Sequence, residues 1–450
     1  MRHNLFPLAC GLIASTQMST AAIVDKPNII VLLVDDLGYG DLSCQGVAQD
    51  IHTPNIDKLL NQGIRFTNFH ANCPVSSPSR ASVLTGRYPD MVGVPGVIRT
   101  RENDSWGYLS PEAVLLPEMT KRCGYKSAII GKWHLGLESP NTPNERGFDY
   151  FYGFLGDMMD DYYTHLRRGF NYMRENHTVI NPQGHATDIF TDATVQYIQS
   201  QQTAAAPFML YLAYNAPHGP IQPPAAWYDK VHKREPQASE TRAKLIALIE
   251  HLDYNIGKVY DSLESTGQLE NTLIIFASDN GGDYYAGANN KPFRGAKQDM
   301  YEGGICVPAG VYWKNHITPA VSDNLVMHMD ILPTICDLLG LSVEHKVDGM
   351  SILPLLEGKA QTTDERMVYF VRREGNNAYG GKAYYAAYYK GHKILQNTPF
   401  LPLEYFDLNQ DRQEQNDLIN QKDPQYQKLF NGMMEHIRIS GSIPWTKPQK

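Results

Sequence analysis

The sequence predicts an α/β fold: a large, mixed but mostly parallel β-sheet sandwiched by helices, followed by a smaller C-terminal α+β subdomain with an antiparallel sheet. Four short apolar runs separated by helical stretches predict the first part, because continuous apolarity is typical of strands buried on both faces of a parallel sheet. After about residue 365 the chain changes to short segments rich in Tyr and Val with Gly-containing turns, which predicts the second part.

Polar residues directly follow each of the four predicted strands. The strands are residues 28–34, 127–130, 208–213 and 273–277, and the residues after them are Asp35-Asp36, Gly131-Lys132-Trp133-His134, Asn215-Ala216-Pro217-His218 and Asp279-Asn280. Because ligands of open α/β sheets bind beyond the carboxyl ends of the strands, we expect these clusters to meet at one edge. Residues 54–62 and 241–263 have helical character and lie between the strands, as βα repeats require.

The C-terminal subdomain is predicted to span residues 366–450, after a main domain of residues 23–365. Its strands are expected within residues 368–372 and 383–395, with turns at Gly380-Gly381 and Lys390-Gly391. Residues 424–439 are expected to form a closing helix. In the main domain, the long charged stretch 157–169 is predicted to form the wall of a cleft rather than part of the core.

Length and charge limit the classes of function. A chain of 450 residues can bury a large core. It carries 40 basic and 48 acidic residues, a net charge of −8, so we expect no nucleic-acid partner and no general attraction to anionic membranes. An anionic substrate would therefore have to be met by a local cluster of positive charge.

The first 22 residues have the pattern of a secretory signal peptide, with Arg2 and His3 before an apolar run and small residues at its end. We therefore expect a periplasmic or secreted protein. A lipoprotein anchor at Cys10 is not expected, because Pro7 stands where such signals usually have Leu. No later stretch is long and apolar enough for a transmembrane segment. The five remaining cysteines have no spacing typical of a disulfide framework or a zinc site.

Residues 76–87, Ser-Ser-Pro-Ser-Arg-Ala-Ser-Val-Leu-Thr-Gly-Arg, are the most informative segment of the chain. One interpretation is structural: Ser76 caps a helix whose first turn contains Pro78, since both residue types are favoured there. The other is chemical, with Ser76 in a reactive site. The two interpretations are compatible, because the start of a helix also binds anions.

This segment matches the signature of the formylglycine-dependent sulfatases, which belong to the alkaline phosphatase superfamily, and the chain resembles their serine-type, prokaryotic branch. The resemblance extends from about Pro27 to about Leu408. It implies that a radical-type maturase oxidises Ser76 to formylglycine before export. A hydrated aldehyde has two hydroxyls, one to attack sulfur and one that expels sulfate once deprotonated. Modification of Cys73 instead would require Pro and Arg where the chain has Val75 and Ser77.

The resemblance also implies a metal site made of Asp35, Asp36, Asp279, Asn280 and the modified Ser76. Three carboxylates and one amide oxygen are hard ligands, which favour Ca²⁺ or Mg²⁺ over a transition metal, and calcium is the family's precedent. Taken singly, each acidic pair is also compatible with an ordinary turn at the end of a strand.

Five further residues match the catalytic positions of the family. By this resemblance Lys132 and Lys297 hold sulfate oxygens, a task for fixed positive charge, and Arg80 braces the formylglycine diol. His134 orients the diol and later accepts its proton. His218 donates a proton to the departing alcohol, since histidine is the usual donor near neutral pH.

The expected substrate is a sulfated oligo- or polysaccharide. The segments that begin at Phe370, Tyr379 and Leu395 resemble sulfatases of marine bacteria that act on algal galactans such as carrageenan. Glycosaminoglycan or aryl sulfates, phosphomonoesters or phosphonates, and a non-enzymatic glycan-binding role with unmodified Ser76 stay open as alternatives. Candidate contacts to sugar rings and further sulfates are Tyr39, Trp106, Tyr162, Tyr163, Tyr284, Tyr285, Arg99, Arg101, His165, Arg167, Arg168, Arg294, Arg372 and Arg373.

Overall fold

A computed structural model describes residues 26–374, 382–421 and 423–448. The predicted signal peptide and the predicted turn at Gly380-Gly381 lie outside the described residues. Within them no helix has both the length and the apolar character needed to cross a membrane.

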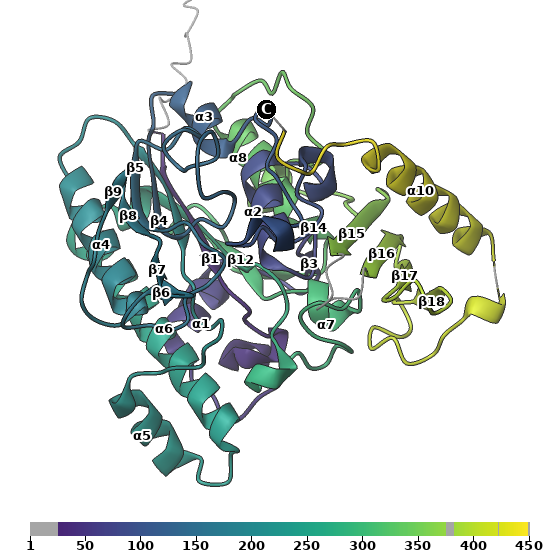
Figure 1. The fold of residues 1–450 in the computed structure, drawn as a ribbon, viewed down its shortest axis with the longest axis horizontal. Helices are drawn as coiled ribbons and strands as arrows, with labels where there is room; N and C mark the ends of the chain where they lie inside the picture. The colour runs from purple at the N-terminus through teal and green to yellow at the C-terminus, as the bar shows by residue number, and fades with distance from the viewer. Residues whose placement is uncertain (1–25, 375–381, 422, 449–450) are drawn as a thin grey trace, which may run out of the picture.

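The main domain is built on a ten-stranded sheet with the order β13-β2-β12-β11-β1-β10-β4-β5-β8-β9 (Figure 1). The four strands predicted from apolar runs are its adjacent central strands, and β5 extends this parallel set. Antiparallel pairing enters at both edges of the sheet. The bounds are β1 (Asn28–Val34), β2 (Ile64–Phe66), β4 (Lys126–Lys132), β5 (Tyr150–Phe154), β8 (Met173–Glu175), β9 (Thr178–Val179), β10 (Phe208–Ala213), β11 (Thr272–Ser278), β12 (Ala309–Tyr312) and β13 (Ala320–Ser322).

Helices cover both faces of this sheet, as the continuous apolarity of its strands predicts. In β1, Ile29 and Val31 point into one core and Ile30 and Leu32 into the other, because side chains alternate along a strand. The first core is closed by α2 (Ser76–Thr85), α3 (Leu116–Lys121) and α8 (Ile331–Leu338). The second is closed by α1 (Pro54–Gln62), α4 (Ala186–Gln201), α5 (Ala225–Arg234) and α6 (Glu240–Ser265).

The C-terminal part contains a separate four-stranded antiparallel sheet, as predicted. Its strands follow one another as β15 (Val368–Glu374), β16 (Lys382–Tyr389), β17 (His392–Gln396) and β18 (Glu404–Asp407). The turn between β16 and β17 is at Lys390 and Gly391, both with positive φ, which suits a tight two-residue hairpin. One face packs on the main domain through Phe370 and Leu395. The helix α10 (Pro424–Ser440) covers the other face (Figure 1).

Short elements complete the chain between these layers. Two small pairs are parallel β3 (Phe69–His70) with β14 (Val326–Met327), and antiparallel β6 (Leu166–Arg167) with β7 (Phe170–Asn171). Two one-turn helices are α7 (Glu302–Ile305) and α9 (Leu353–Leu356). Five free cysteines occur in the described part of the chain, and three of them are buried.

Candidate active site

The predicted site residues converge at the carboxyl ends of the central strands. Asp35 and Asp36 follow β1, Lys132 is the last residue of β4, and Asp279 follows β11. The helix α2 brings Ser76 to the same place from the face covered by the first core. The expectation that these polar clusters meet at one edge of the sheet is therefore fulfilled in the fold.

Ser76 is the first residue of α2 and is directed toward the acidic residues rather than toward the helix. Its hydroxyl donates to Oδ1 of Asp35 at 2.9 Å, and only 4% of the residue is exposed. The position before the helix is taken by Val75, and no side chain caps the helix there. The structural interpretation of Ser76 as a capping residue is therefore wrong, because its oxygen is engaged with a carboxylate.

The two acidic pairs form one hydrogen-bonded cluster. The backbone N–H of Asp36 donates to Oδ1 of Asp279 at 3.1 Å, and Nδ2 of Asn280 donates to Oδ1 of Asp36 at 2.8 Å. Asp36 has a φ of 68°, a left-handed conformation that turns the chain back over the strand end. The cluster is not a set of ordinary exposed turns, since all of these residues are buried.

Three cationic side chains neutralise this cluster. Nζ of Lys132 lies 2.6 Å from Oδ2 of Asp35, and Nζ of Lys297 lies 2.7 Å from Oδ2 of Asp36. The guanidinium of Arg80 lies 3.1 Å from Asp279 and 3.5 Å from Asp35. Burial alone would raise the pKa of Asp35, but the positive neighbours, of which Lys132 has the largest effect, together hold it well below its usual value.

The acidic cluster fits a divalent cation with oxygen ligands. Oδ1 of Asn280 is buried and has no hydrogen-bond partner among the residues that the structure describes, so one hard donor atom is left over. Burial, and then the charge of Asp35, raise the pKa of Asp279 to about 7. A third carboxylate therefore resists ionisation here, and a bound cation would relieve that crowding. Carboxylate and amide oxygens suit Ca²⁺ or Mg²⁺.

His134 is held as a neutral base. It has a φ of 60°, and its Nε2 donates to the backbone carbonyl of Ile98 at 2.9 Å. Burial, and then the charges of Lys132 and Arg80, lower its pKa well below the ordinary range. Because Nε2 carries the proton, Nδ1 is an acceptor, and it has no partner within the described part of the chain.

His218 lies next to the acidic cluster. Its Nδ1 donates to the carbonyl of Gly219 at 2.7 Å, which leaves Nε2 as the unprotonated nitrogen, 3.6 Å from Oδ2 of Asp36. Burial, followed by the charge of Lys297, lowers its pKa. The ligand atoms of His218, Asp35 and Asp36 all lie within 4.8 Å of one another. His218, expected only to donate a proton, therefore also lies next to the acidic cluster.

A hollow of about 140 Å³ opens above Ser76. Four predicted residues line it: Ser76, His134, His218 and Lys297. The other lining residues are Val75, Val97, Arg99, Asp157, Met158, Arg167, Gln298 and Arg372. The stretch 157–169 thus contributes to the wall of the hollow, as predicted, but Met159 and Tyr162 also pack into the second core, so the expectation that it lies outside the core is wrong. Among the eight basic candidates for sugar contacts, three line this hollow.

Sequence reasoning overlooked Asp157 and Gln298 as individual residues of the hollow. Gln298 follows Lys297 and has a φ of 82°, but the sequence gives no signal for that conformation. Two of the aromatic candidates, Tyr39 and Tyr162, are buried and are not available to stack on a sugar. Tyr285 is 97% exposed and is the most accessible of the six.

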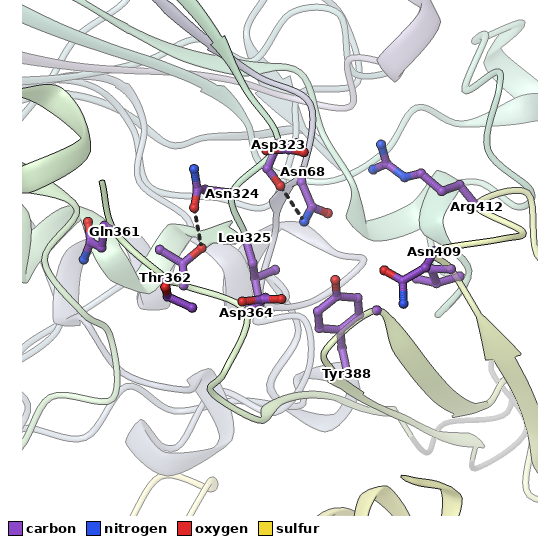
Figure 2. Close-up of a pocket in the computed structure, with 13 residues that line it drawn as sticks. Asn68, Asp323, Asn324, Leu325, Gln361, Thr362, Asp364, Tyr388, Asn409 and Arg412 are labelled. Atoms are coloured by element: carbon purple, nitrogen blue, oxygen red, sulfur yellow. Dashed lines mark hydrogen bonds between the residues drawn. The ribbon is translucent and has the colours of Figure 1, made fainter. Parts of the chain in front are cut away.

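A larger hollow of about 400 Å³ lies next to the C-terminal sheet, and it contains none of the predicted site residues. Amide and carboxyl side chains surround it, together with Tyr388 and Arg412 (Figure 2). Since neither the acidic cluster nor Ser76 reaches it, we place the candidate active site in the smaller hollow.

Several known proteins are similar to this chain over most of its length. Residues 27–341 match the family model described as Sulfatase, and residues 295–440 match the model described as N-sulphoglucosamine sulphohydrolase, C-terminal. The uncharacterized sulfatase YdeN of Escherichia coli (strain K12) is 33% identical over 387 residues, 75% of this chain and 67% of that protein. N-acetylgalactosamine-6-sulfatase of Mus musculus is 31% identical over 385 residues, 80% of this chain and 71% of that protein.

Solved structures share the fold of this chain. A crystal structure of Ps i-CgsB in complex with k-i-k-neocarrahexaose has a TM-score of 0.85 and 29% sequence identity, over 94% of this chain and 95% of that one. A phosphonate monoester hydrolase of Agrobacterium radiobacter shares the fold at a TM-score of 0.65 with 20% identity.

Proposed function

Since the chain belongs to the sulfatase family and is a sulfuric ester hydrolase, we propose that it removes sulfate from a sulfated carbohydrate, an algal galactan such as carrageenan. The observation that carries this proposal is the position of Ser76. Its hydroxyl points into the buried acidic cluster and lines the same hollow as His134, His218 and Lys297. A single small pocket thus contains a candidate nucleophile, positive charge and two imidazoles.

We propose that Ser76 is converted to formylglycine, as the family resemblance implies. The hydrated aldehyde has two hydroxyl groups on one carbon, whereas serine has only one. This carbon lies at the start of α2, where the first backbone N–H groups of a helix have no partner within the helix, and its oxygen contacts Asp35. Arg80 is fully buried and contacts both Asp35 and Asp279, so it holds these two carboxylates in place.

The residues proposed to hold the cation are Asp35, Asp36, Asp279, Asn280 and the modified Ser76. Calcium is our proposal, with magnesium as the alternative. When bound, such an ion supplies positive charge next to the sulfate oxygens. The leftover Oδ1 of Asn280 supports this assignment, because a buried oxygen without a partner is costly unless a ligand satisfies it.

The remaining tasks are sulfate binding and proton transfer, and the charge and protonation of each side chain indicate which task it performs. Lys132 and Lys297 are preorganised by their carboxylate partners, so they can hold sulfate oxygens without reorganisation. Nδ1 of His134 is a neutral acceptor, suited to take a proton from a hydroxyl at residue 76. Nε2 of His218, 3.6 Å from Oδ2 of Asp36, is our candidate to protonate the departing sugar oxygen, a role for which it must first take up a proton from solvent.

The galactan assignment rests on likeness to Ps i-CgsB, whose structure holds the carra-oligosaccharide k-i-k-neocarrahexaose. N-acetylgalactosamine-6-sulfatases are also relatives, so glycosaminoglycan sulfates are the main alternative. Release of free sulfate should be measured on carrageenan oligosaccharides, sulfated glycosaminoglycan fragments and an aryl sulfate. Release from carrageenan fragments supports the proposal, whereas release only from another glycan overturns the choice of substrate.

Two rival functions have direct tests. A phosphatase or phosphonate hydrolase of the same superfamily would prefer the phosphate ester over the sulfate ester of one phenol. A glycan-binding protein without activity would keep an unmodified Ser76, which a mass measurement of its peptide detects.

We also propose export to the periplasm or beyond, after modification by a maturase. An amino-terminal sequence beginning near residue 23 in exported material would support it.

A further inference from the structure

Three arginines line the hollow above Ser76, and they come from distant parts of the chain. Arg99 lies after α2, Arg167 in β6, and Arg372 in strand β15 of the C-terminal sheet. Their ion pairs are made with Asp157, Asp160 and Glu374. Lys132 and Lys297, in contrast, pair with the acidic cluster. Among the residues that line the hollow, the arginines therefore have ion-pair partners separate from that of Lys297.

Arg167 is held rigidly by a carboxylate that also lines the hollow. Its Nε donates to Oδ1 of Asp157 at 2.9 Å and its Nη2 to Oδ2 at 3.1 Å, a bidentate pair. Its Nη1 donates to Asp160 at 2.6 Å. These contacts use three of the five N–H groups of a guanidinium, so Arg167 keeps donors for a further anion.

Arg99 and Arg372 share one carboxylate. Nη2 of Arg99 lies 2.5 Å from Oε2 of Glu374, and Nε of Arg372 lies 3.0 Å from Oε1. Burial opposes the ionisation of Glu374, but the two guanidiniums together lower its pKa. Two guanidiniums therefore contact opposite oxygens of one buried carboxylate.

Cationic side chains outnumber anionic ones among the residues that line the hollow, because the partners Asp36, Asp160 and Glu374 are not part of the lining. Four lining side chains are cationic, Arg99, Arg167, Lys297 and Arg372, and one, Asp157, is anionic. Asp160, a second partner of Arg167, lies toward solvent with 43% of its side chain exposed, where its charge is screened more effectively. We infer that the arginine wall, meaning Arg99, Arg167 and Arg372, binds a second acidic group, sulfate or carboxylate, on the sugar that carries the scissile ester or on its neighbour.

This inference rests on the proposed function and adds to it a preference for polyanionic glycans. A group bound at the wall would set the position of the sugar relative to Ser76, so the wall selects which ester is cleaved. Arg372 also donates to the carbonyl of Gln298, the residue after Lys297, at 3.1 Å. Changes at Arg372 would therefore disturb the Lys297 loop as well. Arg167 is the better residue to change, since its partners Asp157 and Asp160 belong to its own segment.

The test compares two oligosaccharides that carry the same scissile sulfate, one of them with a second sulfate and the other without it. A third oligosaccharide, with a carboxylate in place of the second sulfate, shows which of the two anions is preferred. We expect the wild type to have a kcat/KM at least about tenfold higher for the doubly charged substrate, the effect of one charge-assisted hydrogen bond. Arg167→Gln should lower this ratio toward one, mainly through KM, and Arg167→Lys should keep part of it. Arg122→Gln, which changes an exposed arginine outside the hollow, is the matched control and should keep the wild-type ratio.

The proposed function and this inference fail in different ways. Hydrolysis of the singly charged substrate tests the function, whereas the ratio between substrates tests the wall. Equal kcat/KM for both substrates in the wild type, or an equal loss on both in Arg167→Gln, would overturn the inference while leaving the sulfatase activity in place. If neither substrate is cleaved, the ratio of the two dissociation constants, measured by calorimetry on the same proteins, decides the question by the same criteria.

Discussion

Nζ of Lys297 lies 2.7 Å from Oδ2 of Asp36, and this contact joins the loop before α7 to the end of the first strand of the sheet. Burial alone would lower the pKa of Lys297, but Asp36 and then Asp35 together outweigh it, so the pKa is raised. The lysine is therefore a permanent positive charge held in place at the edge of the hollow.

Replacing Lys297 should mainly affect the chemical step. Lys297→Ala is expected to lower kcat for sulfate release by roughly two to three orders of magnitude, the scale seen when one preorganised charge stabiliser is lost. The exposed Lys291→Ala is the control and should behave as wild type. A Lys297→Ala variant with turnover within threefold of wild type would refute the assignment.

Calcium should stabilise the folded protein through the acidic cluster. Adding it to chelator-treated protein is expected to raise Tm, because a ligand at 100 times its Kd contributes about 2.7 kcal/mol to folding. Asp36→Asn should lose most of this increase, whereas Asp323→Asn, an exposed residue of the larger hollow, should keep it. An unchanged Tm of the wild type on addition of calcium or magnesium would argue against the metal site.

The acidic cluster could be predicted because its residues directly follow continuous apolar strands. Runs such as residues 28–34 define a buried parallel strand, and the topology of parallel sheets then brings the strand ends together. The role of Ser76 in the helix could not be predicted in the same way. Serine is favoured as a cap, and only the nearby Asp35 shows that Ser76 does not act as one.

Pairings between distant charged residues were beyond sequence reasoning. Arg99 and Glu374 are 275 positions apart, and Glu374 lies in a strand whose predicted end was residue 372. No local sequence pattern at either residue predicts that the two form an ion pair. The sequence offered eight basic candidates for sulfate contacts, and selecting three of them required the shape of the hollow.

A buried ion cluster joins the C-terminal sheet to the main domain. Lys393, fully buried in β17, donates to Glu302 at 2.8 Å and to Glu414 at 2.7 Å, and Glu302 also contacts His70. Lys393→Met would leave two buried carboxylates without this partner and is expected to lower the free energy of unfolding by about 3–5 kcal/mol.

Urea unfolding at neutral pH measures this loss. Lys244→Met, which removes an exposed pair with Glu240, is the control and should change the curve little. Equal midpoints for Lys393→Met and wild type would show that the cluster does not hold the two parts together.

Folding stability should depend on pH through His185, which precedes α4. Its Nδ1 accepts from the backbone N–H of Thr187 at 3.3 Å and its Nε2 donates to the carbonyl of Gln222 at 3.0 Å. Burial, and then His251, lower its pKa from 6.5 to about 4. A lowered histidine pKa means that the unfolded chain binds the proton first. The stabilisation is thus complete above pH 6.5 and is lost as the pH falls toward 4.

The expected slope from this residue is up to about 1.4 kcal/mol per pH unit between these values. His185→Asn keeps a side-chain acceptor for the helix but does not titrate, so its stability curve should be flatter over this range. Parallel curves for the two proteins between pH 6.5 and 4 would contradict the argument.

The central claim is that a modified Ser76 removes sulfate from a sulfated galactan, and it predicts a proportionality. The fraction of the Ser76 peptide that has lost two hydrogens should be measured by mass spectrometry in several preparations, alongside the rate of sulfate release from carrageenan oligosaccharides in each. The account predicts that the rate rises in proportion to the converted fraction and vanishes in Ser76→Ala. Undiminished sulfate release from protein whose Ser76 is entirely unmodified would contradict it.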